Sequence, residues 1–161
     1  MKTHINNSIK EIVQACITCS PQSQHLSLLK EFHGFTGISN FSQTIKDLIS
    51  INQMSVFGIS HDMQNILKHI NQLKMLSSIT TITKMFQKEY EQMHKRTVVI
   101  VSIAKDQEIS VDEIIQFLTQ KISQSADFIF KLHSTLGITV QFNNSIIQYT
   151  PDSIMKMLKI A

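Results

Sequence analysis

The residues with the clearest chemical potential are two cysteines one helical turn apart, Cys16 and Cys19, followed by His25 and His33. Thiolate and imidazole groups are the usual ligands of structural zinc, and a CxxC pair can also carry redox chemistry. The sequence lacks the second CxxC or the close histidine pair that would complete a zinc site. Both sulfurs fall on the apolar face of a predicted helix, so we interpret the cysteines as small core residues and expect no metal and no cofactor.

A second motif, Gly34-Phe-Thr-Gly37, has the GxxG spacing of the loop with which KH modules bind single-stranded RNA. Its middle pair is Phe35-Thr36, where a polar or basic pair is usual, and no strand is predicted before it. Lys and Arg outnumber acids only by 8 to 6 before residue 95 and by 7 to 6 from there on, so no basic patch is predicted for a nucleic acid. We interpret the motif as a connection between helices and keep a KH-like module as a lesser alternative.

No pattern in the sequence predicts catalysis. The four glycines, at positions 34, 37, 58 and 137, form neither a phosphate-binding loop nor a dinucleotide fingerprint or nucleophile elbow. The seven histidines are scattered, and the neighbours His61 and Asp62 would point in different directions on a helix. Most of the eight methionines fall at predicted core positions, where a thioether fills gaps. We therefore expect a protein that is not an enzyme.

Composition is that of a folded chain, with 42% hydrophobic and 17% charged residues in 161. No apolar run approaches the roughly 20 residues that span a bilayer. The first residues, MKTHINNSIKEI, have neither the apolar region of a secretory signal nor an arginine-rich transit pattern. These features favour a cytosolic address, or a mature chain that has already been processed, with no direct membrane insertion.

The periodicity of apolar residues predicts helices over most of the first 95 residues. Ser20 before Pro21, Asn40 with Gln43, and Ser60 are the expected helix starts. The five expected apolar stripes are Ile9/Ile12/Val13/Cys16/Ile17, Leu26/Leu28/Leu29/Phe32, Phe41/Ile45/Leu48/Ile49, Met63/Ile66/Leu67/Ile70/Leu73 and Ile79/Ile82/Met85/Phe86/Tyr90/Met93. A helical bundle is predicted for residues 1–95.

From Thr97 the pattern changes to β-branched residues, which predicts a buried strand through Ile103. Ser110 and Glu113 form a capping box that opens an amphipathic helix, and residues 128–132 suit another strand. Residues 139–142 and 145–149 form a predicted hairpin around Asn143-Asn144, and a last helix begins at Pro151. The chain is therefore predicted to be α+β, with a small α/β unit over residues 96–161.

This order of elements resembles the delta subunit family of rotary, F-type ATP synthases, relatives of the mitochondrial oligomycin-sensitivity-conferring protein. The likeness is clearest from Asn65 to Leu158. It rests on the paired helices that end at Tyr90, the run Val99-Ile-Val-Ser-Ile-Ala104, the pair Ile109-Ser110, and the segments 133–137 and 146–150. The chain departs from the family pattern where Ile12 replaces a tyrosine, His133 and Gln148 replace aspartates, and Gly137 alone remains of a glycine pair.

The resemblance implies a mechanical role. It implies a stator subunit whose helical unit grips the amphipathic N-terminal helix of a catalytic-head alpha subunit and whose α/β unit engages the peripheral-stalk b subunit. The expected location is the cytoplasmic face of the bacterial inner membrane or the matrix face of the mitochondrial one, as a peripheral protein. The rival interpretation is a helical adaptor with an unrelated partner, which periodicity cannot distinguish.

The resemblance also places two helices side by side as the partner groove. The apolar faces of these helices are wide, so part of each is expected to stay exposed until the partner covers it. The predicted partner-binding residues are Ile9, Val13, Cys16, Ile66, His69 and Ile70.

Overall fold

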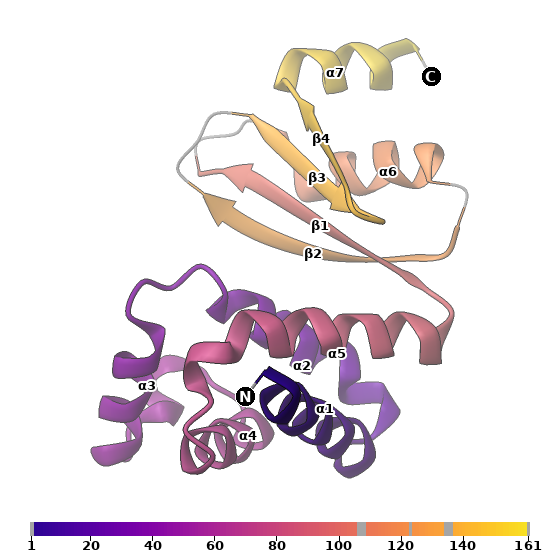
Figure 1. Ribbon diagram of the computed structural model, residues 1–161. Coiled ribbons are helices and arrows are strands. Elements are labelled where there is room, and N and C mark those ends of the chain that lie inside the picture. Colours follow the sequence, from indigo (N-terminus) through magenta and orange to yellow (C-terminus); the bar gives the residue numbers. More distant parts are fainter. Residues whose placement is uncertain (1, 106–108, 123, 134–136, 161) are drawn as a thin grey trace. The chain divides into compact units, whose positions relative to one another are not determined.

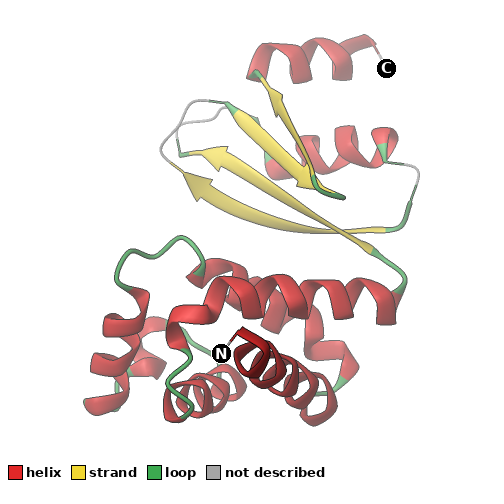
Figure 2. Cartoon of the chain, viewed as in Figure 1, coloured by secondary structure: helices red, strands yellow, loops and turns green. Residues whose placement is uncertain are grey.

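The computed structural model describes residues 2–105, 109–122, 124–133 and 137–160, which form seven α-helices, three short 3-10 helices and four strands (Figure 1). Helices make up the first part of the chain and the sheet lies in the second, so the chain is α+β, as the sequence predicted (Figure 2). Contacts divide it into two units, residues 1–90 and 91–161. No helix in the described ranges is long and apolar enough to cross a membrane.

The first unit is a helical bundle. Its helices are α1 (Lys2–Cys19), α2 (His25–Phe35), α3 (Phe41–Ser50), α4 (His61–Gln72) and most of α5 (Ile79–His94), joined in part by 3-10 turns at Gln22–Gln24, Met54–Phe57 and Leu76–Ser78. Each helix buries one stripe of apolar side chains, as the periodicity predicted. The fully buried members include Ile9, Leu29, Phe32, Met63, Leu67, Ile70, Ile82 and Phe86.

The starts of the helices only partly follow the predicted caps. The Ser60 hydroxyl accepts a hydrogen bond from the Met63 N–H at 3.3 Å, so this predicted cap is confirmed. Asn40 occupies the N-cap position of α3 as predicted, but the predicted capping pair with Gln43 is wrong. Asn40 has a left-handed φ of 57° and no side-chain cap bond, while the Gln43 side chain donates to Asp47 instead. Pro21 opens a 3-10 turn rather than α2 itself, which begins four residues later at His25.

Two helices of this unit end in the same six-residue closure, the Schellman motif. At the end of α4 the N–H of Met75 donates to the carbonyl of Ile70 and that of Lys74 to Asn71. At the end of α3 the corresponding bonds run from Gln53 to Leu48 and from Asn52 to Ile49. The residue that must adopt a left-handed φ is Asn52 in one motif and Lys74 in the other.

The second unit is built on a mixed sheet in the order β2-β1-β3-β4. Strand β1 (Thr97–Ala104) pairs in parallel with β2 (Ala126–His133) and antiparallel with β3 (Ile138–Phe142), which pairs with β4 (Ser145–Tyr149). Strand β1 is paired along both of its edges, and seven of its eight residues are buried. That burial explains why the β-branched run from Thr97 identified this strand.

Helices α6 (Val111–Lys121) and α7 (Pro151–Ile160) complete this unit. The capping box of Ser110 and Glu113 starts α6 as predicted, with both reciprocal bonds present. The core joins one face of the sheet to the helices through Val99, Val101, Ile103, Ile138, Val140, Ile114, Phe117, Leu118 and Ile154.

The predicted hairpin and the conformation of Gly137 each have a local cause. Asn143 and Asn144 have φ angles of 47° and 62°, the left-handed pair that a tight two-residue hairpin requires. Gly137 has a φ of 98°, and a Cβ there would lie 3.2 Å from the Tyr149 carbonyl oxygen. Of the segment 133–137 used in the family resemblance, residues 134–136 lie outside the described residues.

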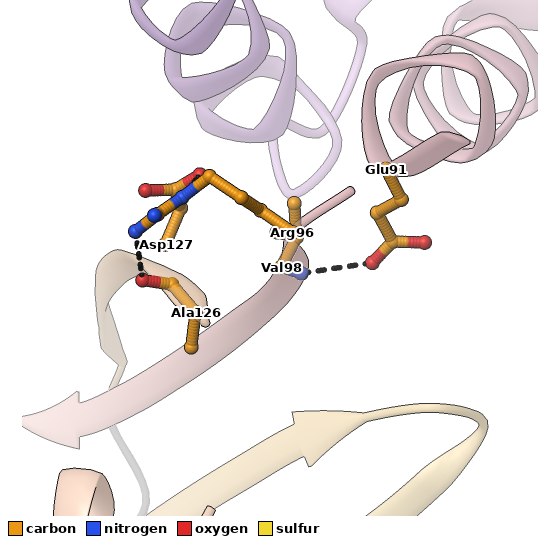
Figure 3. Close-up of polar contacts among 5 residues, drawn as sticks. All are labelled: Glu91, Arg96, Val98, Ala126 and Asp127. Carbon is orange, nitrogen blue, oxygen red and sulfur yellow. Dashed lines mark hydrogen bonds and ion pairs between the residues drawn. The ribbon is translucent and has the colours of Figure 1, made fainter. Parts of the chain in front are cut away.

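Polar contacts fix the entry into β1 (Figure 3). Arg96 donates through Nε to a carboxylate oxygen of Asp127 at 2.8 Å and through a terminal nitrogen to the Ala126 carbonyl at 2.7 Å. The Val98 N–H donates to the Glu91 carboxylate at 2.9 Å, which ties the last turns of α5 to this unit. The division after Tyr90 therefore comes slightly earlier than the predicted one, because Glu91 bonds to β1.

Candidate functional site

The candidate site is a groove of about 300 Å³ in the helical unit, between α1 and α4. It is lined by Ile12, Ala15, Cys16 and Cys19 of α1, by Ser20 just after this helix, and by Asp62, Asn65, Ile66 and His69 of α4. Within each helix the spacing is three or four residues, which places these side chains along one stripe. The groove therefore follows the helix axes, as an elongated binding surface should.

The floor of the groove is apolar. Ile12 and Cys16 are 2% and 5% exposed, so they form its base, while Ile66 is half-buried on its wall. Burial and the neighbouring Cys19 raise the pKa of the Cys16 thiol to about 12. The thiol is neutral at physiological pH and acts as an apolar surface rather than as a nucleophile.

The rim of the groove is polar. Ala15, Cys19, Asp62, Asn65 and His69 are exposed. Asp62 lies in the first turn of α4, where the helix dipole favours a negative charge. Asn65 Nδ2 lies 3.3 Å from His61 Nδ1, which holds the amide on the same turn. Asp62 is the only carboxylate among the lining residues, which include no lysine or arginine, so the rim of the groove is acidic at this point.

The structure places the six predicted partner-binding residues in two different environments. Cys16, Ile66 and His69 line the groove. Ile9, Val13 and Ile70 do not, and they are 2%, 1% and 0% exposed. These three side chains pack inside the helical unit, so a ligand in the groove would reach none of them without rearrangement of the bundle.

The sequence reasoning missed the remaining groove residues, above all Ala15, Asp62 and Asn65. The signal that could have found them is the helical period itself. The face of α1 that lines the groove is displaced by about one residue from the predicted face, and it contains Ile12 and Ala15 instead of Ile9 and Val13. On α4 the same shift brings in Asn65 and leaves out Ile70, while Ile66 and His69 stay. Small and polar residues at the edge of an apolar stripe mark its exposed border, and of these the predicted set contains only Cys16 and His69.

The cysteine and histidine hypothesis has a different structural context. His25 is buried and its Nε2 lies 3.2 Å from the Ile17 carbonyl and 3.1 Å from the Ser20 carbonyl, so it closes the end of α1. His33 Nε2 lies 2.9 Å from the Gln87 side-chain oxygen. Among the residues that the structure describes, no three His, Cys, Asp or Glu side chains are grouped to hold a metal ion.

The GxxG segment lies at the end of a helix. Gly34 is the penultimate residue of α2 and Gly37 follows in a turn. The Phe35 ring stacks against that of Phe41 in α3, with centroids 5.2 Å apart. The segment thus joins two packed helices, which is the role we assigned to it.

The chain was also compared with known proteins. No protein-family model matches it, and no curated protein matches it at a significant level.

Proposed function

We propose that this chain is a non-catalytic stator subunit of an F-type ATP synthase, which links the catalytic head to the peripheral stalk during proton-driven ATP synthesis. The observation that carries the proposal is the groove between α1 and α4, because it lies between the two helices in which the delta-family resemblance locates the head-binding surface. The α+β architecture is consistent with that resemblance.

The occupant that fits this groove is an amphipathic helix. Its floor is apolar and elongated, and the apolar stripe continues beyond it on both helices. Ile5 lies seven residues before Ile12 on α1, and Leu73, the C-cap residue just after α4, lies seven residues after Ile66; 41% and 46% of their surfaces are exposed. Seven residues are about two helical turns, so Ile5 lies on the groove face of α1, and Leu73 continues the line of Ile66 at the end of α4. Exposed apolar residues aligned in this way are what the apolar face of a docking helix covers.

The charge of the groove adds a requirement for the partner. Asp62 is exposed at the rim, so a lysine or arginine beside the apolar face of the partner helix would pair with it. Such a rim pair chiefly affects association rate and salt dependence. The apolar floor supplies most of the affinity. For the head contact, we propose the N-terminal helix of the alpha subunit as this partner.

The second unit provides the other attachment, to the peripheral-stalk b subunit. Two attachment points suit a stator. While one site is bound, the second site stays at a high effective concentration near its own partner. The load on such a link is torque, so slow dissociation matters more than fast association. Neither contact needs catalytic groups or a cofactor. The proposed location is peripheral, on the cytoplasmic face of the bacterial inner membrane or the matrix face of the mitochondrial one.

Co-purification tests this proposal. A tagged chain produced in its own organism should bring down the alpha and b subunits of the ATP synthase from solubilised membranes. The Ile66→Asp variant should lose the alpha subunit but keep the b subunit, since it alters only the groove. Recovery of neither subunit would contradict the stator role and leave an unrelated helical adaptor as the better interpretation.

Thiol labelling maps the contact independently. Cys19 is exposed on the groove wall and Cys16 is buried beneath it, so a maleimide reagent should modify Cys19 alone in the native protein. A bound alpha-subunit peptide should slow that labelling. Labelling at an unchanged rate under saturating peptide would place the peptide outside the groove.

A further inference from the structure

A second cavity in the helical unit has a different chemical character. It has a volume of about 600 Å³ and is lined by Ser42 and Lys46 of α3, Asn71 of α4, and Lys74, Leu76 and Ser77 just beyond α4. Ser42 and Lys46 are one helical turn apart, so both lie on one side of α3, next to its buried stripe of Phe41, Ile45 and Leu48. Two lysines, two serines and one asparagine thus line the same cavity.

The lining contains no carboxylate to neutralise the two lysines. Asp47, beside Lys46 on α3, does not line the cavity, and its carboxylate accepts a hydrogen bond from the Gln43 amide at 2.8 Å. Within the described ranges, the polar side chains of Ser42, Lys46, Asn71, Lys74 and Ser77 have no hydrogen bond or ion pair with other protein groups. Their donors are therefore available to a ligand.

The position of Lys74 is notable for its backbone. Lys74 holds the left-handed position of the Schellman motif that ends α4, with a φ of 57°. Glycine or asparagine fills that position at lower cost, as Asn52 does at the end of α3. The motif fixes the Cα of Lys74 at the edge of the cavity, so the side chain that carries the amine extends from a rigid backbone position.

We propose that this cavity, named here the α3–α4 cavity, binds an oxyanion of the phosphate class. A tetrahedral phosphate offers several acceptor oxygens to the hydroxyls and the amide, and its negative charge matches the two ammonium groups. Lysine serves such sites as a point charge without bidentate geometry, which suits a cavity with no arginine. This inference is independent of the stator proposal, since it uses neither the groove nor the second unit.

Calorimetric titration of the whole chain with inorganic phosphate, at constant ionic strength set by chloride, tests the assignment. We expect saturable binding, and at least tenfold weaker affinity in the double variant Lys46→Gln/Lys74→Gly. Glycine suits the left-handed position, so this variant keeps the fold, which a thermal melt checks. The control Lys30→Gln/Lys84→Gln removes the same charge from exposed positions outside the cavity and should bind phosphate as the native chain does.

Flotation with vesicles distinguishes the two sources of phosphate, a lipid headgroup and a free phosphate or phosphate ester. Vesicles of phosphatidylglycerol should retain the native chain but not the cavity variant if a lipid headgroup can enter, and vesicles of phosphatidylcholine alone serve as the charge control. Binding in the titration alone assigns a free phosphate or phosphate ester. The proposal is overturned if neither arm shows binding, or if the cavity variant and the control variant lose binding equally.

Discussion

The Glu91 carboxylate, in the last turns of α5, accepts a hydrogen bond of 2.9 Å from the backbone N–H of Val98 in β1. Thr97 donates its N–H towards β2, to the Ser125 carbonyl, so the next N–H along the strand points to the opposite side. On that side β3 pairs with β1 only from Ile100 onward. Val98 is fully buried, and Glu91 therefore supplies the acceptor that no strand provides there.

Replacement of Glu91 by alanine should destabilise the second unit by about 1–3 kcal/mol, because a buried donor loses its charged acceptor. Glu91→Gln keeps a neutral acceptor and should cost less. Amide hydrogen exchange, read by NMR at Val98, reports the bond directly. Equal protection of this amide in the native chain and in Glu91→Ala would show that the carboxylate is not its partner.

Limited proteolysis should cut the chain at Lys95, in the turn between α5 and β1. The Lys95 side chain is exposed, whereas Arg96 is engaged with Asp127 and Thr97 already belongs to β1. Trypsin should therefore cut first after Lys95, and Asp127→Ala should increase cleavage after Arg96, because it removes one of the two partners that hold this side chain. Mass spectrometry of the early fragments identifies the bonds. Cleavage at this junction only under denaturing conditions would argue against an accessible linker.

Lys74→Gly should raise the stability of the helical unit by about 1 kcal/mol, because an L side chain in the left-handed region carries that order of cost. Asn52→Gly makes the same change in the matching motif of α3 and should gain less, since asparagine tolerates this conformation. Urea denaturation of the two variants gives the comparison. A loss of stability in Lys74→Gly would mean that the lysine side chain makes a stabilising contact that outweighs its backbone strain.

Stability should fall at alkaline pH through Cys16. Its pKa is raised from 9.0 in the unfolded reference to about 12 by burial, so folding favours the neutral thiol. That contribution is complete below pH 9 and is lost as the pH rises from 9 towards 12. Urea midpoints measured on either side of pH 9 should show a smaller alkaline loss in Cys16→Ala than in the native chain. An equal fall of the urea midpoint with pH in both proteins would show that Cys16 is not the cause.

Much of the fold follows from local sequence signals. The β-branched run at β1, the capping box of α6 and the Asn143-Asn144 hairpin each predicted an element that the structure contains. These signals succeed because a cap or a turn is settled by residues within a few positions of each other. The Asn40 and Gln43 pair failed for the same local reason, since a left-handed backbone at Asn40 removes the geometry that a cap requires.

The groove was harder to predict than the helices that form it. Periodicity identifies the apolar face of a helix. When that face is wide, the part that meets a neighbouring helix can shift by one residue with no change in the sequence pattern. Whether Val13 or Ala15 meets the groove depends on how α1 is rotated against its neighbours, which is decided by packing across the whole bundle. The predicted set favours large apolar residues, and three of its six members, Ile9, Val13 and Ile70, lie in the core and do not line the groove.

The groove between α1 and α4 is proposed to bind the N-terminal helix of an alpha subunit, and calorimetric titration with that peptide is the most direct test. Ile66→Asp and Ala15→Asp, which place a charge in the groove, should each weaken binding by at least ~1.4 kcal/mol, or tenfold. Lys68→Glu, on α4 but outside the groove, should bind as the native chain does. Thermal melts confirm that each variant is folded. Native affinity in both folded groove variants would show that the alpha-subunit peptide does not bind in this groove.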